Sequence, residues 1–192
     1  MLRTNFENDL NKLHVDLDKM CHLVILAIEN CIVAFKSGDR ELCRDILAGD
    51  KVINDMERTI EARCLSLILK QQPIASDLRN VSTALKVVTD LERIGDQSAD
   101  IAEILLETDV TCPYKMVEHI PNMARLARDM VKGSIEAFHE HDLKKANQIK
   151  ELENQMNRLF EEVKVELVQI VNESKENVDV VINFLMIAKY FE

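Results

Sequence analysis

The stretch AFKSGD at residues 34–39 decides how the chain is organised, because a similar stretch, AFHEHD, returns at residues 137–142. In the first copy, glycine followed by aspartate is typical of a helix end and of the residue that caps the next helix. Both copies follow long segments with an apolar residue at every third or fourth position, which predicts helices with one buried face. The recurrence predicts two similar halves.

Three long helices are predicted in the first half, over residues 5–36, 40–71 and 76–107. The second ends before Pro73, because the residue preceding a proline is disfavoured in helical geometry. Helices of the second half match them, with a shift of 103 residues in the middle helix and of 100 residues in the last. The matched pairs are Ile53 with Met156, Met56 with Leu159, Ile60 with Val163, Cys64 with Leu167, Val81 with Val181, Leu85 with Leu185, Val88 with Ala188, and Glu92 with Glu192.

The predicted fold is therefore all-α, with two tandem three-helix bundles related by an internal repeat. Residues 1–107 form the first repeat, residues 108–116 a linker, and residues 117–192 a second repeat whose last helix is incomplete. Because Glu192 takes the place of Glu92, the chain stops inside its second copy of this motif, and we expect it to be C-terminally truncated. Four glycines and three prolines are too few for the turns of a many-stranded sheet.

The composition narrows the classes of function. A formal net charge of −10 repels a phosphate backbone, so nucleic acid is not an expected partner. Charges are expected to interrupt every apolar stretch before the roughly 18 residues of a membrane span, and the N-terminal residues lack a signal-peptide core. We expect a soluble, cytoplasmic protein with reduced core thiols and no disulfide framework. The five cysteines are Cys21, Cys31, Cys43, Cys64 and Cys112.

The candidate site is a row of carboxylates in the stretch DLERIGDQSAD, residues 90–100. Glu92, Asp96 and Asp100 lie four residues apart, where like charges on one helix repel. The helical period places Glu92 within the apolar stripe and the other two toward its edge. A half-buried carboxylate takes up a proton or binds a cation, which makes the row a candidate metal site.

Two observations bear on the metal hypothesis. Glu192 recurs at the equivalent position of the second repeat, and the small residues Gly95 and Ala99 leave room for a ligand or for another helix. The alternative is a solvated row, or one neutralised by Arg79, Arg93 or a residue of another helix.

Other candidates are weaker. His14 and His22, on the first predicted helix, are expected to be packed or solvated. Glu136 and His139 form a single Glu-x-x-His pair, whereas a ferritin-like di-iron site needs two. The run HEH at residues 139–141 is typical of a helix terminus, with a weak surface metal site as the alternative. No Gly-rich phosphate loop or nucleophile elbow occurs in the sequence.

Four motifs resemble one known family. They are DKVINDME at 50–57, QQPIASDLR at 71–79, LERIGD at 91–96 and IAKYFE at 187–192. Together they are similar to PhoU, the accessory and regulatory proteins of bacterial phosphate-specific transport. The resemblance implies two three-helix bundles related by a pseudo-twofold axis. It also implies an acidic Glu/Asp-x-x-x-Asp motif in each half, which in some members binds iron or zinc and in others magnesium or manganese.

Carried over to this chain, the first motif is Glu92 and Asp96, with Asp100 where many members have Asn and Gln97 where His is frequent. Glu192 alone represents the second motif. The resemblance further implies a non-enzymatic negative regulator of phosphate uptake and starvation signalling. Its implied partners are the ATPase subunit of the phosphate ABC transporter, the sensor histidine kinase and a second copy of itself, with any membrane association arising through those partners. The alternatives are a carboxylate-bridged metalloenzyme and a purely structural interaction bundle.

Overall fold

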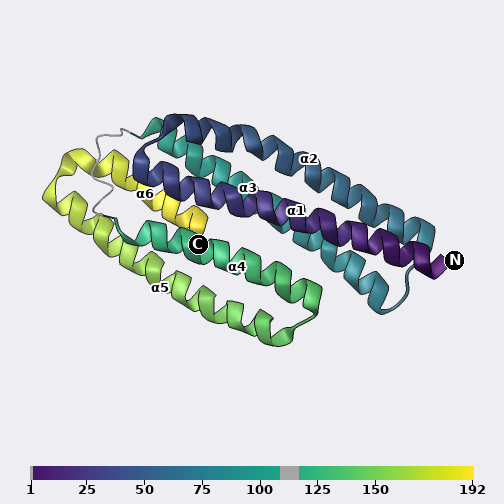
Figure 1. Ribbon diagram of the computed structural model, residues 1–192. Coiled ribbons are helices and arrows are strands. Elements are labelled where there is room, and N and C mark those ends of the chain that lie inside the picture. The colour runs from purple at the N-terminus through teal and green to yellow at the C-terminus, as the bar shows by residue number, and fades with distance from the viewer. Residues whose placement is uncertain (1, 109–116) are drawn as a thin grey trace.

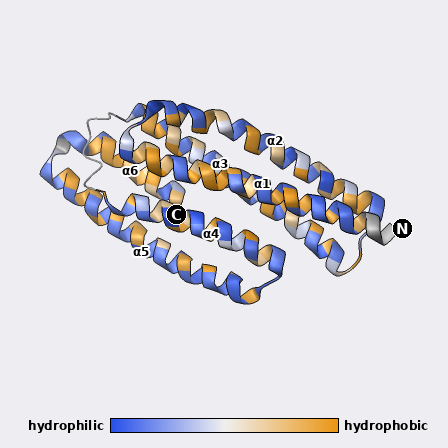
Figure 2. Ribbon diagram, viewed as in Figure 1, coloured by the Kyte–Doolittle hydropathy of each residue, from blue (hydrophilic) through white to orange (hydrophobic). Residues whose placement is uncertain are grey.

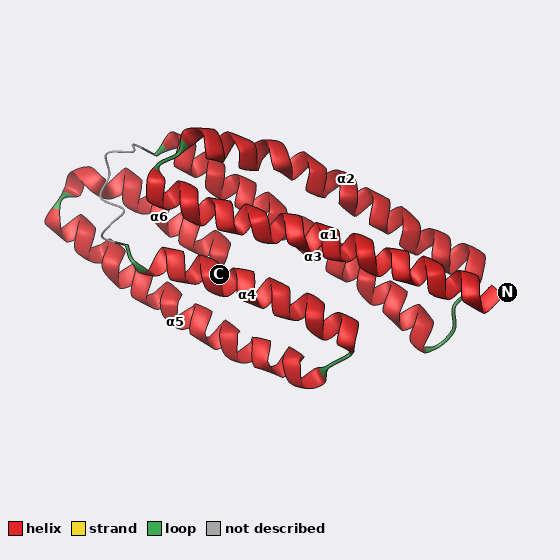
Figure 3. Ribbon diagram, viewed as in Figure 1, coloured by secondary structure: helices red, strands yellow, loops and turns green. Residues whose placement is uncertain are grey.

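Long helices make up nearly all of the chain that the structure describes. The computed structural model describes residues 2–108 and 117–192, without the side chains of residues 2–5 and 175. These residues form six α-helices and a short 3₁₀ helix, and no strand occurs among them (Figures 1 and 3). The elements are α1 (Leu2–Ser37), α2 (Arg40–Gln71), α3 (Ser76–Glu107), α4 (His119–Glu140), α5 (Leu143–Glu173), η2 (Lys175–Asn177) and α6 (Val178–Phe191).

The first two connections have the same local structure in both halves. Gly38 and His141 both adopt positive φ, at 68° and 52°, which ends α1 and α4. The following aspartates, Asp39 and Asp142, then cap α2 and α5 by accepting hydrogen bonds from backbone amides two and three residues ahead. The repeat seen in AFKSGD and AFHEHD is therefore a repeated helix end and cap.

Helix α1 forms the centre of the molecule and packs against α2, α3 and α4. Its buried face has a relative exposure of 0–1% at Leu13, Leu17, Met20, Val24, Ile28 and Cys31. Helices α1–α3 form one bundle and α4–α6 the other, and the two join through the α1–α4 and α3–α6 contacts (Figure 1). Figure 2 shows mainly hydrophilic residues along α5 and largely hydrophobic residues along α6. The predicted pair of tandem three-helix bundles is confirmed.

The matched core positions of the two repeats are buried alike in the middle helices. Ile60 and Val163 are both 0% exposed, and Cys64 and Leu167 are 0% and 3% exposed. The match weakens in the last helices, where Val81 is buried but Val181 is only half-buried and Leu185 is exposed. The repeat therefore holds best where both halves are covered by neighbouring helices.

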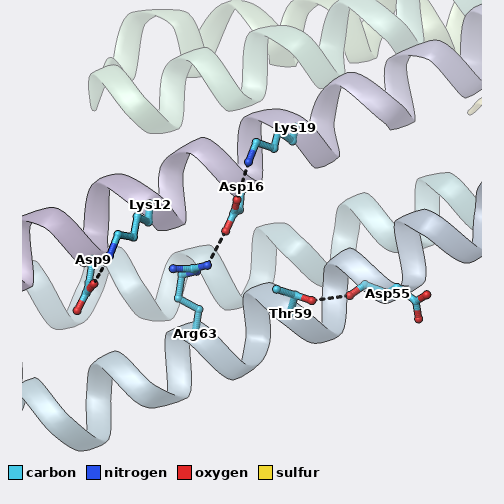
Figure 4. Close-up of polar contacts among 7 residues, drawn as sticks. All are labelled: Asp9, Lys12, Asp16, Lys19, Asp55, Thr59 and Arg63. Carbon is cyan, nitrogen blue, oxygen red and sulfur yellow. Dashed lines mark hydrogen bonds and ion pairs between the residues drawn. The ribbon is translucent and has the colours of Figure 1, made fainter.

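One charged contact between helices recurs with different chemistry. In the first repeat, Arg63 of α2 lies 3.0 Å from Asp16 of α1 (Figure 4). At a shift of 103 residues, the Nδ1 atom of His119 on α4 lies 2.7 Å from Glu166 on α5. The acid has moved to the other helix, and an imidazole replaces the guanidinium. The two repeats therefore have a charged contact at equivalent positions, but the acidic and basic side chains that form it differ.

Three expectations have different outcomes. The four described cysteines, Cys21, Cys31, Cys43 and Cys64, are free and buried, as predicted. Cys112 and most of the predicted linker lie outside the described residues. The expected interruption of all apolar stretches was wrong for α1: by length and composition, Phe6–Ser37 could cross a membrane. Core helices meet the same criterion, and one face of α1 is covered by other helices.

Helices α2 and α3 pack tightly against each other at Gly95. A β-carbon added there would lie 3.0 Å from Cγ2 and 3.1 Å from Cδ1 of Ile53 on α2. The small residue predicted to leave space for a ligand or a helix therefore admits α2. Gly49, inside α2, has no atom within 4 Å of the same added carbon.

These two glycines give a matched test of the close approach. We expect Gly95→Ala to destabilise the protein, because overpacking costs about 1–3 kcal/mol and exceeds the gain in helix propensity of about 1 kcal/mol. Gly49→Ala should stabilise it by about 1 kcal/mol, since only the propensity changes. Urea unfolding at one pH measures both. Equal stabilisation by the two substitutions would contradict the close approach.

Candidate acidic site between α2 and α3

The contact between α2 and α3 brings two rows of acidic side chains together. Helix α3 contributes the predicted row, Glu92, Asp96 and Asp100. Helix α2 contributes Asp50 and Glu57, whose charges act on the α3 row. We call these five carboxylates, together with Asn54, the acidic seam.

Asp50 is the most constrained member of the acidic seam. Its Oδ2 atom accepts a hydrogen bond of 3.0 Å from the Asn54 amide. The Oδ1 atoms of Asp50 and Asn54 are buried without a hydrogen-bond partner among the described residues. Burial, followed by the negative charge of Asp96 and by a side-chain hydrogen bond with Asp96, raises the pKa of the Asp50 carboxyl. The seam therefore holds two unsatisfied oxygen acceptors beside a second carboxylate.

Burial and neighbouring negative charges also raise the pKa values of the two glutamates of the seam. Burial raises the pKa of Glu92, and Asp96, Glu57 and Asp50 raise it further, against the opposing effect of Arg93. Burial also raises the pKa of Glu57, with Glu61 and Asp96 adding to it and Arg58 opposing.

The two arginines that act on the glutamates of the seam, Arg93 and Arg58, form their ion pairs outside it. Arg93 lies 4.0 Å from Asp90, and Arg58 lies 3.4 Å from Asp55. The seam therefore repels itself, and this repulsion favours a proton or a bound cation.

Asp100 connects the seam to the other repeat. It interacts with Tyr190 of α6, where burial and then Asp100 raise the pKa of the phenol. Asp100 also acts weakly on Asp50, as the last of the groups that raise its pKa. The row on α3 thus runs from the α2 contact to the contact between the repeats.

The sequence placed Glu92 inside the apolar stripe, and this was wrong. The buried face of α3 consists of Val81, Ala84, Val88, Leu91, Gly95, Ser98, Ile101 and Ala102. Glu92 is half-buried at the border of this face, Asp100 is half-buried and Asp96 is exposed. The stripe is centred differently because α3 packs against both α1 and α2. Glu92 keeps the partial burial on which the hypothesis depended.

Glu192 lies apart from the acidic seam. It forms an ion pair with Lys189 and borders a cavity of about 330 Å³ shared with Asp90 and Phe191. Nearby on α5, Phe160 occupies the position equivalent to Glu57. Its ring lies 5.2 Å from the Lys164 ammonium and 5.5 Å from that of Lys189. The second repeat thus places a lysine, Lys164, where the first has Glu61.

The donor atoms of the seam suit a hard cation, since they are all carboxylate or amide oxygens. Within the described parts of the chain, however, no three His, Cys, Asp or Glu side chains are arranged to hold a metal ion. The unsatisfied oxygens of Asp50 and Asn54 and the mutual repulsion favour a cation, and side-chain rotation would have to complete its coordination. The metal assignment of Glu92, Asp96, Asp100 and Glu192 stays a prediction.

The α2 side of the seam was not predicted from the residues themselves. Asp50, Asn54 and Glu57 have the spacing i, i+4, i+7, which places them on one helix face. That spacing was a usable signal, but it does not say which other helix the face meets.

Comparison with known proteins matches this two-repeat architecture. The model of the PhoU domain matches residues 17–105 and again residues 120–192. The chain belongs to the PhoU family. The two matches to this PhoU family member fall in the two helical repeats.

Relatives and a solved structure agree over nearly the whole chain. A "phosphate-specific transport system accessory protein PhoU homolog" of Clostridium acetobutylicum is 36% identical over 193 residues, covering 100% of this chain and 88% of the relative. The homolog from Aquifex aeolicus is 31% identical, covering 91% and 79%. The crystal structure of PhoU from Pseudomonas aeruginosa superposes with a TM-score of 0.87 at 27% identity, covering 97% of this chain and 90% of that one.

The raised carboxyl pKa values predict an unusual pH dependence of stability. Just above the ordinary pKa of 3.8 for Asp50, the folded protein binds more protons than the unfolded chain, so this group makes stability fall as pH rises. Asp50→Asn should therefore raise the free energy of unfolding at neutral pH in a metal chelator, with the gain disappearing in acid. Urea unfolding at several pH values measures it.

Asp55→Asn is the matched control on α2, because Asp55 is exposed and paired with Arg58. It should give no such gain at neutral pH. A loss of stability in Asp50→Asn at neutral pH would show that Asp50 is favourably ionised.

Proposed function

We propose that this PhoU family member is a non-enzymatic accessory protein that represses phosphate uptake and phosphate-starvation signalling. Family membership over both repeats and the names of its relatives support this role. It would act in the cytoplasm as a helical adaptor, docking on the ATPase subunit of the phosphate ABC transporter and on the sensor histidine kinase. A homodimer is part of the proposal.

We further propose that the acidic seam holds divalent or trivalent metal ions. The observation that supports this most is the buried, unpartnered Oδ1 atom of Asp50 beside Asp96. Burial and then like charges raise the pKa of Asp50 and Glu92, and a cation there would satisfy the oxygen and cancel the repulsion. By joining α2 to α3, the metal would stabilise the first repeat. Iron, zinc, manganese and magnesium are the candidates.

Metal binding predicts a loss of stability on chelation. EDTA should lower the Tm of the metal-loaded protein, and Glu92→Ala combined with Asp96→Ala should abolish both this shift and the metal found by elemental analysis. Asp90→Asn is the matched control, because Asp90 is an exposed acid of the same helix that lies beside Arg93. Unchanged metal content in the double variant would refute the site.

The regulatory role predicts an effect in phosphate-replete cells. In a strain lacking its own family member, the chain should silence a reporter driven by a phosphate-starvation promoter. Continued reporter expression, with the protein folded and present, would contradict the role. A phosphate-turnover assay on the metal-loaded protein separates this function from a metalloenzyme, since an adaptor releases no product. Measuring the reporter with the metal-site double variant shows whether repression requires the metal.

A further inference from the structure

The contact between α1 and α4 joins the two repeats and contains a pair of histidines. His14 of α1 and His139 of α4 have ring centroids 4.7 Å apart at an angle of 60°. The ring of Phe138 closes over His14 at 5.8 Å in an edge-to-face arrangement. Two side chains that can each carry a positive charge thus pack directly against each other across the boundary between the repeats.

The two histidines have different surroundings. The Nε2 atom of His139 lies 2.7 Å from Oδ1 of Asp18, and His139 is in the last turn of α4, where a positive charge is favoured. His14 is half-buried between the rings of Phe138 and His139. His139 therefore has a carboxylate partner, whereas His14 is enclosed by two rings.

The other charged groups around His14 do not offset the effects that disfavour a proton on its ring. Burial lowers the pKa of His14, His139 and then His141 lower it further, and Asp18 alone opposes them. On α2, Arg63 already pairs with Asp16. On α5, Lys145 forms ion pairs with Glu136 and Glu140 of α4.

We propose that the His14–His139 pair is a pH-sensitive clasp between the two repeats, closed while His14 is neutral and loosened when His14 accepts a proton. A proton on His14 places a charged ring in a half-buried contact between Phe138 and His139, and separating the rings restores water to it. The sign follows from the lowered pKa: the folded protein takes up fewer protons than the unfolded chain, so the closed contact loses stability as pH falls below the ordinary value of 6.5.

Cys21 is a local reporter of this contact. It lies on α1 two turns after His14, is 6% exposed, and feels the charge of Glu136 on α4. Cys64 on α2 is 0% exposed within the first bundle. Burial raises the pKa of both thiols to about 11, so their intrinsic reactivity changes equally with pH. The ratio of labelling at the two thiols therefore reports exposure of the α1–α4 contact.

The test labels the full chain with dithiodipyridine above and below the pH at which histidine titrates, near 6.5, and reads each cysteine by peptide mass spectrometry. We expect the Cys21 to Cys64 ratio to rise several-fold on acidification in the native protein, and to stay flat in His14→Gln. His22→Gln is the matched control, because His22 is an exposed histidine of the same helix; it should behave as the native protein does. A flat ratio in the native protein, or an undiminished rise in His14→Gln, would overturn the clasp.

A second measurement does not depend on the folding of the His14 variant. In a histidine-ring NMR titration of the native protein, the midpoint of His14 should lie below 6.5. In His139→Gln the same midpoint should move upward, because one opposing positive charge has gone. A His14 midpoint that His139→Gln leaves unchanged would show that the two rings are not coupled, and would also overturn the clasp.

Discussion

The close packing of α2 on α3 at Gly95 is the contact on which the acidic seam depends. With no side chain at Gly95, Ile53 reaches the backbone of α3. The neighbouring turns of both helices carry carboxylates, so the same contact that buries Ile53 also brings Asp50 toward Asp96. Apolar burial stabilises the pair of helices while like charges at their border oppose it. The seam is therefore partly buried, and its negative charges repel one another because both helices contribute carboxylates to the same contact.

The helices were predictable because a few adjacent residues, such as capping aspartates and prolines, determine where each helix begins and ends. Asp39 caps α2 as expected, and α2 and α3 have the predicted bounds on either side of Pro73. The internal repeat, visible as two helix ends followed by aspartate caps, supplied the tandem arrangement. These features depend on a few adjacent residues, so a single sequence is enough to show them.

The site was only partly predictable, because its geometry depends on which helices face each other. The spacing of Glu92, Asp96 and Asp100 is visible on one helix, but the facing Asp50 is joined to them only by packing. The helical period also centred the apolar stripe on Glu92, since it could not show that α1, α2 and α6 all pack against α3. His14 was unremarkable in the sequence for the same reason: its neighbour His139 lies on a helix of the other repeat.

The two repeats show that a shared core does not carry a shared charge pattern. Glu153 and Asn157 of α5 stand where Asp50 and Asn54 stand on α2, so this part of the polar pattern is kept. Around them, however, Glu57, Glu61 and Thr89 are replaced by Phe160, Lys164 and Lys189. Lys164 pairs with Glu161, and Lys189 with Glu192. The second repeat thus places lysines at two of these three positions, whereas the first places glutamates at two of them. Apolar positions are held by packing in both halves, but surface charges are free to diverge. An equivalence found from core residues therefore matches Glu192, the residue after the end of α6, with Glu92 without giving it the electrostatic setting of Glu92.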